Sequence, residues 1–234
     1  MKHYRIAGLR VAMDSHGRTL KQAIPYEIEP VGDPDIVIQS HAESLKQQQP
    51  HLSIEDCEYL STGSSFYTQL MKHDGMMLHA SCVVLDGKAY LFTAPCGTGK
   101  STHTGLWLKQ FGDCAFILND DKPALRLENG IWYAYGTPWS GKYDISRNTK
   151  APVAGIAVVQ RGEENEIEPY SGRDAIYFLL TQVVRPRAAD YRILLLETMD
   201  KLLNCVPVWK LKCNMNPDAA LVAYEAMSRC AKEK

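Results

Sequence analysis

The segment Ala94-Pro-Cys-Gly-Thr-Gly-Lys-Ser101 has the residue types that a phosphate-binding loop requires. Glycines let consecutive backbone N–H groups point at a phosphate without obstruction by Cβ atoms. A lysine after them can reach the β- and γ-phosphates of a nucleotide, and a neighbouring hydroxyl can hold Mg²⁺. Ala94 stands where glycine is usual. The segment predicts a nucleotide-phosphate site, and the alternative is a chance Gly-x-Gly-Lys-Ser turn.

The residues expected to bind the nucleotide are Pro95, Cys96, Gly97, Thr98, Gly99, Lys100, Ser101 and Thr102. Lys100 is also a candidate catalytic residue, because it would contact the transferred phosphate. The side chain of Cys96 is expected to point away from the phosphates, where it could react with thiol reagents. His103, Trp107 and Phe111 recur every four residues on one helical face. We expect the last two to pack on a sheet and His103 to lie near the adenine or the rim.

Two adjacent carboxylates, Asp120 and Asp121, follow an apolar stretch and lie about 20 residues beyond Lys100. A carboxylate at a strand end beside a phosphate loop can bind Mg²⁺ directly or through water. A second carboxylate could accept the proton of an incoming hydroxyl. The alternative for such a pair is a helix cap or a turn. Its position after a phosphate loop favours metal binding.

His79 lies in the segment Leu78-His-Ala-Ser81, which is expected to form a strand beside the one that enters the loop. A strand histidine is usually a satisfied polar group with no role in chemistry. Here the expected register would place the imidazole within reach of the phosphates or the metal. His79 is therefore a third candidate catalytic residue, after Lys100 and Asp121.

Hydrophobic patterns and turn residues predict the elements that position these side chains. Strands are expected over 78–85, 88–93 and 115–118, with a helix over 100–111 after the loop. Further strands are expected over Tyr4–Met13, Ile36–Ile38, Ala124–Leu127, Ile131–Tyr135, Val153–Val159 and Val206–Leu211. Further helices are expected from Ser171 toward Val184, from Tyr191 to Leu203, and after Asn216 and Pro217. We predict one domain, 1–234, with a strand-and-loop lobe at 1–60 and a catalytic core at 61–234.

Two tight turns determine the expected fold class. Asp86-Gly87 joins the strand over 78–85 to the strand that enters the loop, and Asn129-Gly130 joins the next pair. Such turns make antiparallel hairpins, whereas common nucleotide-binding sheets are parallel and built from crossovers. The sequence therefore predicts an α/β protein with a mixed, hairpin-rich sheet.

Composition limits the partners. The chain has 234 residues, 45% of them hydrophobic, which is enough for one sizeable core. Its 26 Lys and Arg residues balance 27 Asp and Glu residues, and this argues against nucleic acid or an anionic membrane as the main partner. The sequence shows no secretion signal and no apolar stretch long enough to span a bilayer. Seven cysteines without a CxxC pair predict reduced thiols in the cytoplasm.

Three motifs in order resemble the nucleotide-binding core of the HPr kinase and phosphoenolpyruvate carboxykinase superfamily. They are Leu78-His-Ala-Ser-Cys-Val, Leu91-Phe-Thr-Ala-Pro-Cys-Gly-Thr-Gly-Lys-Ser101 and Leu118-Asn-Asp-Asp121, and the resemblance covers about residues 78–160. It implies that Ser101 and one aspartate bind Mg²⁺ or Mn²⁺, and that the other aspartate is the general base. It also implies that His79 contacts the metal or the γ-phosphate. We assign Asp120 to the metal and Asp121 to the base.

The chain is too short for the second lobe of carboxykinases, and Ser101-Thr102 differs from the pattern of HPr kinases, in which glutamate follows the hydroxyl residue. It most resembles the small HPr-kinase-related, serine kinase-like proteins. This implies an ATP-dependent kinase that transfers the γ-phosphate to a serine hydroxyl of a small molecule, peptide or protein. The alternatives are a non-catalytic nucleotide sensor or scaffold and, less favoured, a carboxykinase-like enzyme. The sequence does not determine whether the chain forms a homo-oligomer.

The loop Gly136-Thr-Pro-Trp-Ser-Gly-Lys142 fits the same group, because it is rich in small residues and carries one aromatic ring and one cation. We interpret Lys142 as a phosphate or substrate contact and Trp139 as a pocket wall. The alternative is an ordinary turn with a packed tryptophan. Further candidates to neutralise transition-state charge are Arg147, Arg185 and Arg187.

Overall fold

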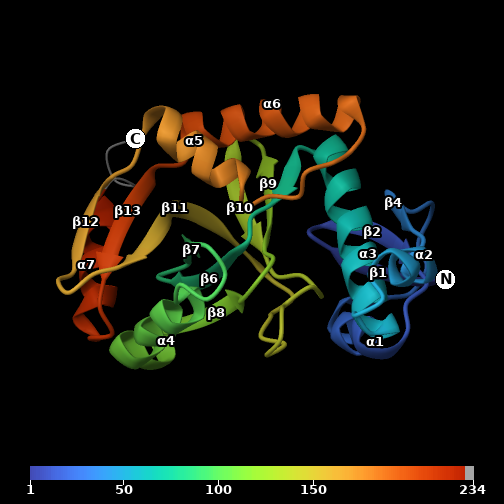
Figure 1. Cartoon of the computed structure of the whole chain (residues 1–234), viewed down its shortest axis with the longest axis horizontal. Coiled ribbons are helices and arrows are strands. Elements are labelled where there is room, and N and C mark those ends of the chain that lie inside the picture. Colours follow the sequence, from blue (N-terminus) through green and yellow to red (C-terminus); the bar gives the residue numbers. More distant parts are fainter. Residues whose placement is uncertain (230–234) are drawn as a thin grey trace.

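The computed structural model describes residues 1–229, which form an α/β structure with two sheets (Figure 1). The N-terminal sheet has four strands in the order β3-β1-β2-β4. They are β1 (Lys2–Ile6), β2 (Leu9–Met13), β3 (Glu27–Ile28) and β4 (Ile36–Ile38). Within the described range, no helix combines the length and the apolar character needed to cross a bilayer.

The larger sheet has nine strands among the described residues, in the order β5-β9-β10-β11-β7-β6-β8, with β13 beside β11 and β12 beside β13. The strands are β5 (Gly75–Met77), β6 (Ala80–Leu85), β7 (Lys88–Thr93), β8 (Ala115–Asn119), β9 (Ala124–Glu128), β10 (Ile131–Tyr135), β11 (Lys150–Arg161), β12 (Glu166–Pro169) and β13 (Val208–Cys213). The long strand β11 runs parallel to β7 and β13 and antiparallel to β10. The predicted mixed α/β fold is thus confirmed.

Both predicted hairpins are present, and turn chemistry accounts for them. β6 and β7 are antiparallel and Leu85 pairs with Lys88, so the intervening turn has two residues. These residues, Asp86 and Gly87, have φ of +51° and +70°, as a type I′ turn requires. Asn129 and Gly130 join β9 to β10 with similar angles.

Helices cover both faces of the sheet around β6, β7 and β8 (Figure 1). On one face lie α4 (Lys100–Phe111) and α7 (Asp218–Arg229), and on the other lie α5 (Gly172–Leu180) and α6 (Ala189–Cys205). Trp107 of α4 is fully buried, and its ring centroid lies 4.9 Å from that of Tyr90 on β7. Phe111 in turn packs on Trp107. The predicted packing of this helical face on the sheet is confirmed.

The N-terminal region differs most from the prediction. The single strand expected over 4–13 is two strands joined by a turn at Ala7 and Gly8, both with positive φ. Three helices in this region were not predicted: α1 (Gly17–Ala23), α2 (Ala42–Gln48) and α3 (Ile54–Leu70). α3 packs its buried face against the N-terminal sheet, so this region is a layered α/β unit rather than strands and loops.

Several other boundaries also differ. The strand expected over 78–85 begins only at Ala80, as β6, because the backbone N–H of His79 donates to Gln182 O (2.7 Å) instead of to a neighbouring strand. β12 was not predicted, β13 begins and ends two residues later than expected, and α5 ends at Leu180. Asn216 does cap α7, since its Oδ1 accepts the N–H of Asp218 (3.1 Å).

Candidate nucleotide and phosphoryl-transfer site

A tight glycine loop (residues 94–99) connects β7 to the N-terminus of α4. Gly97 and Gly99 have φ of +77° and +125°, values that residues with a Cβ rarely adopt. A Cβ at Gly97 would meet no atom within 4 Å, so this glycine is needed for its backbone conformation. The first backbone N–H groups of α4, which have no acceptor within the helix, and the positive end of its dipole lie at this loop. This arrangement favours the binding of anions.

Lys100, at the start of α4, is buried, yet its ammonium group makes a single hydrogen bond within the described range. Its Nζ donates to Ala94 O at 3.1 Å. An ammonium group carries three protons, so two are left for a ligand. Burial is the largest influence on Lys100 and lowers its pKa, although the charges of Asp121, Cys96 and Asp120 oppose it. An anionic ligand at the loop would offset that cost.

Asp120 follows β8 and faces α4. Its Oδ1 accepts a hydrogen bond from Ser81 Oγ at 2.6 Å, and Ser81 Oγ lies 2.7 Å from Thr104 Oγ1 of α4. Burial raises the pKa of Asp120, while hydrogen bonds from the Ser81 and Ser101 side chains oppose the rise. Ser101 and Asp120 are therefore together at the edge of the glycine loop.

Asp121 faces the other way, toward an imidazole and an ammonium group. Its Oδ1 lies 3.2 Å from His79 Nε2, and its Oδ2 contacts Lys122 Nζ. Burial alone would raise the pKa of Asp121, but the His79 hydrogen bond and the Lys122 charge outweigh it and hold this pKa at about 2. His79 thus contacts Asp121 from the break between β5 and β6, and not from within a strand as predicted.

Asn119, the last residue of β8, fixes the backbone turn that contains Asp120 and Asp121. It is fully buried, and its Oδ1 accepts the backbone N–H groups of Asp121 (3.0 Å) and Lys122 (2.7 Å). Its Nδ2 donates to Thr137 O (3.1 Å) and to Ser146 Oγ (3.3 Å). Asn119 was not among the predicted site residues, although asparagine before a turn is a known signal of this geometry.

The loop over 136–142 also reaches the site. Gly141 has φ of +78°, and a Cβ there would lie 2.7 Å from the Cβ of Asp121. The N–H of Gly141 donates to Tyr59 OH (2.9 Å), and Arg18 donates to its carbonyl. Arg18 and Tyr59 come from the N-terminal region, so that region positions a loop in contact with Asp121. Sequence reasoning identified neither residue.

The structure separates the other candidates in this part of the chain from the glycine loop. Trp139 is fully buried and stacks on Phe66 with a centroid distance of 4.9 Å. It is a packed tryptophan and not an open pocket wall. Arg147 stacks on Phe116 at 4.3 Å, and Phe116 belongs to the cluster on the sheet face opposite α4. Lys142 is exposed, and it follows Gly141, the residue at which this loop approaches the side chain of Asp121.

A cavity of about 570 Å³ opens beside the glycine loop. Gly97, Thr98, Gly99 and Thr102 line one side, and the ends of β11 and β13 line the other. His103 lies in its wall, where burial lowers the pKa of the imidazole to about 4. The guanidinium group of Arg161, on β11, donates to Gly97 O (2.9 Å) and to Thr98 O (3.4 Å). Arg161 braces the loop, and sequence reasoning did not identify it.

The oxygen atoms available as metal ligands suit a hard divalent cation. The hydroxyl of Ser101 and the carboxylate of Asp120 are oxygen ligands of the kind Mg²⁺ prefers, and Mg²⁺ commonly completes its shell with water and substrate phosphates. In the described part of the chain, no group of three or more His, Cys, Asp and Glu side chains is placed to hold a metal.

No protein-family model matches the chain, and no curated protein matches it. Among solved structures, it is similar to the HPr(Ser) kinase/phosphatase from Coxiella burnetii, with 15% sequence identity and a TM-score of 0.38. The similarity covers 67% of this chain and 97% of that chain. A likeness this distant carries no functional inference, which must come from the side chains of the site.

Proposed function

We propose that this chain is an ATP-dependent phosphotransferase that transfers the γ-phosphate to the hydroxyl of a serine, free or in a peptide or protein. One observation carries the proposal: two adjacent carboxylates beside the glycine loop have opposite surroundings. Asp120 lies with hydroxyl groups and has a raised pKa, whereas Asp121 lies with His79 and Lys122 and has a pKa of about 2. Binding a nucleotide requires no second carboxylate of this kind, but orienting an acceptor does.

The nucleotide would occupy the glycine loop and the adjoining cavity. The N–H groups of residues 97–102 would surround the β-phosphate, and Lys100 would turn from Ala94 O toward the β- and γ-oxygens. The cavity of about 570 Å³ would take the nucleoside, with His103 in its wall. Pro95 and Cys96 are exposed on the outer part of the loop and would border the phosphates.

Ser101 and Asp120 would hold the magnesium ion, and Mn²⁺ has similar ligand preferences. When bound, the ion supplies positive charge that neutralises the β- and γ-phosphate oxygens. A cation next to Asp120 would also favour the ionised form of this carboxylate, against the burial that raises its pKa.

Asp121 would hold the acceptor hydroxyl in line with the γ-phosphate. A carboxylate with a pKa of about 2 is a weak proton acceptor. However, phosphoryl transfer proceeds through a loose transition state that needs little early proton removal. We therefore give Asp121 the role of accepting a hydrogen bond from the hydroxyl and receiving its proton late. His79 and Lys122 would fix the direction of the carboxylate.

The test is ATP consumption with and without free serine or a serine-containing peptide, together with mass-spectrometric detection of the phosphorylated product. Lys100→Ala should abolish transfer and weaken ATP binding while the far-ultraviolet circular dichroism spectrum is retained, because this ammonium would contact the β,γ-bridge of the bound nucleotide. Turnover within a few-fold of the wild type in that variant would contradict the assignment. Tight ATP binding that neither acceptor converts to turnover would favour a nucleotide sensor.

A further inference from the structure

A second concave surface lies away from the residues of the proposed transfer site. This basic groove, about 720 Å³ in volume, runs between helices α2 and α3 and the segment that joins α5 to α6. Residues from both sides line it, including Ser61, Ser64, Thr68, Arg185, Arg187 and Tyr191. Neither the glycine loop nor the two aspartates contribute to it.

The groove has positively charged side chains on one side and many hydroxyl groups on the other. Arg185 and Arg187 are exposed, and neither makes an ion pair within residues 1–229. Pro186 is buried between them, and its fixed φ reduces the freedom of this segment. Among the groove's lining residues there is no Asp or Glu, whereas Ser, Thr and Gln side chains recur along α2 and α3. Guanidinium groups bind carboxylates well, and hydroxyl and amide groups can pair with a peptide backbone.

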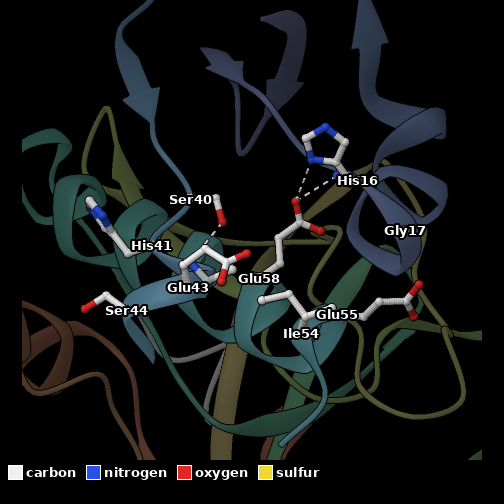
Figure 2. A pocket seen from close by; sticks show the side chains of 10 residues that line it. His16, Gly17, Ser40, His41, Glu43, Ser44, Ile54, Glu55 and Glu58 are labelled. Carbon is white, nitrogen blue, oxygen red and sulfur yellow. Dashed lines mark hydrogen bonds and ion pairs between the residues drawn. The ribbon is translucent and has the colours of Figure 1, made fainter. Parts of the chain in front are cut away.

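The positive surface ends at α2, where an acidic pocket begins. This pocket, about 650 Å³ in volume, shares His41 and Ser44 with the groove and carries the carboxylates of Glu43, Glu55 and Glu58 (Figure 2). A long polyanion such as nucleic acid would extend from the arginines toward these carboxylates and be repelled. A segment with only a few carboxylates, placed at Arg185 and Arg187, would not need to extend across α2.

We propose that the basic groove binds an extended, acidic peptide segment of a partner protein. Its carboxylates would pair with Arg185 and Arg187, and its backbone would lie along the hydroxyl groups of α3. This binding goes beyond the proposed phosphoryl transfer and requires neither nucleotide nor metal. Its test can therefore succeed or fail independently of that function.

The experiment uses the full chain and a fluorescein-labelled peptide with four consecutive glutamates between glycine and serine flanks. Fluorescence anisotropy should show saturable binding that weakens as salt is raised, since surface ion pairs are screened. The double variant Arg185→Glu, Arg187→Glu should weaken binding at least tenfold, and the Arg→Lys pair should recover most of it. Arg173→Glu is the matched control, because Arg173 is exposed on α5 and does not line the groove. It should bind as the wild type does.

Three results would overturn the proposal. One is no saturable binding of the peptide by the wild-type chain. Another is an equal loss of affinity in the Arg173→Glu control, which would show a general charge effect. The third is a single-stranded oligonucleotide that binds more tightly than the peptide and depends on the same two arginines. Circular dichroism and ATP affinity of each variant show that loss of peptide binding does not come from unfolding.

Discussion

Asp120 and Asp121 are neighbours in the chain but belong to different parts of the site. They follow an extended strand, in which successive side chains point to opposite sides. Asp120 consequently meets Ser81 and lies near Ser101, while Asp121 meets His79 and Lys122. Asn119 fixes the turn that keeps them apart. Replacing Asp120 and replacing Asp121 should therefore have different effects on nucleotide binding and on the transfer rate.

Asp120→Asn should weaken binding of the Mg²⁺–nucleotide complex and raise the Mg²⁺ concentration needed for turnover, because a metal ligand loses its charge. Asp121→Asn should leave that binding nearly unchanged and lower the single-turnover rate by about 10²-fold, at the low end for groups that handle a proton. Titration calorimetry and rapid-quench kinetics measure the two effects. Equal loss of binding in both variants would mean that the carboxylates share the metal.

His103 gives a pH dependence of stability that is separate from catalysis. Burial lowers its pKa from 6.5 to about 4, so between these values the unfolded chain binds a proton that the folded chain excludes. Folding stability should therefore be fully present above pH 6.5 and be lost as the pH falls toward 4. The loss should reach up to about 3 kcal/mol at 1.36 kcal/mol per pKa unit.

Urea unfolding of the wild type and of His103→Gln between pH 7 and pH 4.5 measures this loss. Glutamine keeps an acceptor for the indole N–H of Trp107, which donates to His103 Nε2 at 3.2 Å, but it does not titrate. The variant should be less stable than the wild type at pH 7, and the difference should shrink as the pH falls. Parallel stability curves across this range would show that folding does not shift the pKa of His103.

Among the helices and strands, those specified by local chemistry could be predicted. The two hairpins have turn residues that adopt positive φ readily, and the apolar stretch before Asn119 forms β8 as expected. Helix α3 could not be predicted, because Ser, Thr and Gly in its middle have low helix propensity. Burial of one face of α3 against the N-terminal sheet stabilises it. The break at His79 likewise depends on Gln182, far along the chain.

The residues of the candidate site likewise include some that local sequence could predict and others that it could not. The glycine loop and the aspartate pair were identified because each is a short contiguous pattern. Arg161 could not be found, since it contacts the loop only when β11 lies parallel to β7. Trp139 was interpreted as a pocket wall from the composition of its loop, and Arg147 as a cation that neutralises transition-state charge. Their contacts with Phe66 and Phe116 are set by how the sheets and α3 pack.

The loop over 136–142 can be tested at Gly141. Gly141→Ala would combine a strained φ of +78° with a Cβ only 2.7 Å from that of Asp121, so the carboxylate must move. We expect the transfer rate to fall at least tenfold while ATP affinity stays within a few-fold, since misplacement of a positioning group affects the rate strongly. Pre-steady-state kinetics and equilibrium nucleotide binding measure the two quantities.

Gly130→Ala provides the matched control for Gly141→Ala. Gly130 has φ of +81°, and a Cβ there would meet no atom within 4 Å. The control should thus lose a similar amount of stability through backbone strain, roughly 1 kcal/mol, and keep the wild-type transfer rate. A similar rate loss in both variants would attribute the effect on Gly141→Ala to general destabilisation.

Across the whole molecule, one cluster of buried side chains joins the N-terminal sheet to the larger one. It includes Tyr4 and Ile6 of β1, Phe66 of α3, Tyr135 of β10 and Trp139. Trp139 donates its indole N–H to Thr62 Oγ1 (3.3 Å), and a Cβ on Gly63 would come within 2.9 Å of its ring. The N-terminal region therefore shares its core with the region that carries the candidate site.

This shared core supports the prediction that the described chain unfolds as one unit. Hydrogen exchange followed by mass spectrometry at increasing urea should show β1, α3 and β7 losing protection at the same concentration, because exposing the cluster destabilises both sheets. Trp139→Ala should lower the free energy of unfolding by about 3–5 kcal/mol and shift all three segments together. Trp209→Ala is the control, because Trp209 is only partly buried and packs against a different cluster. It should lower the free energy of unfolding by less than Trp139→Ala does. If β1 and α3 lose protection well before β7 in the wild type, the N-terminal region through α3 unfolds separately from the rest of the described chain. In that case Arg18 and Tyr59 would hold the Gly141 loop through an interface between two units, and not through a common core.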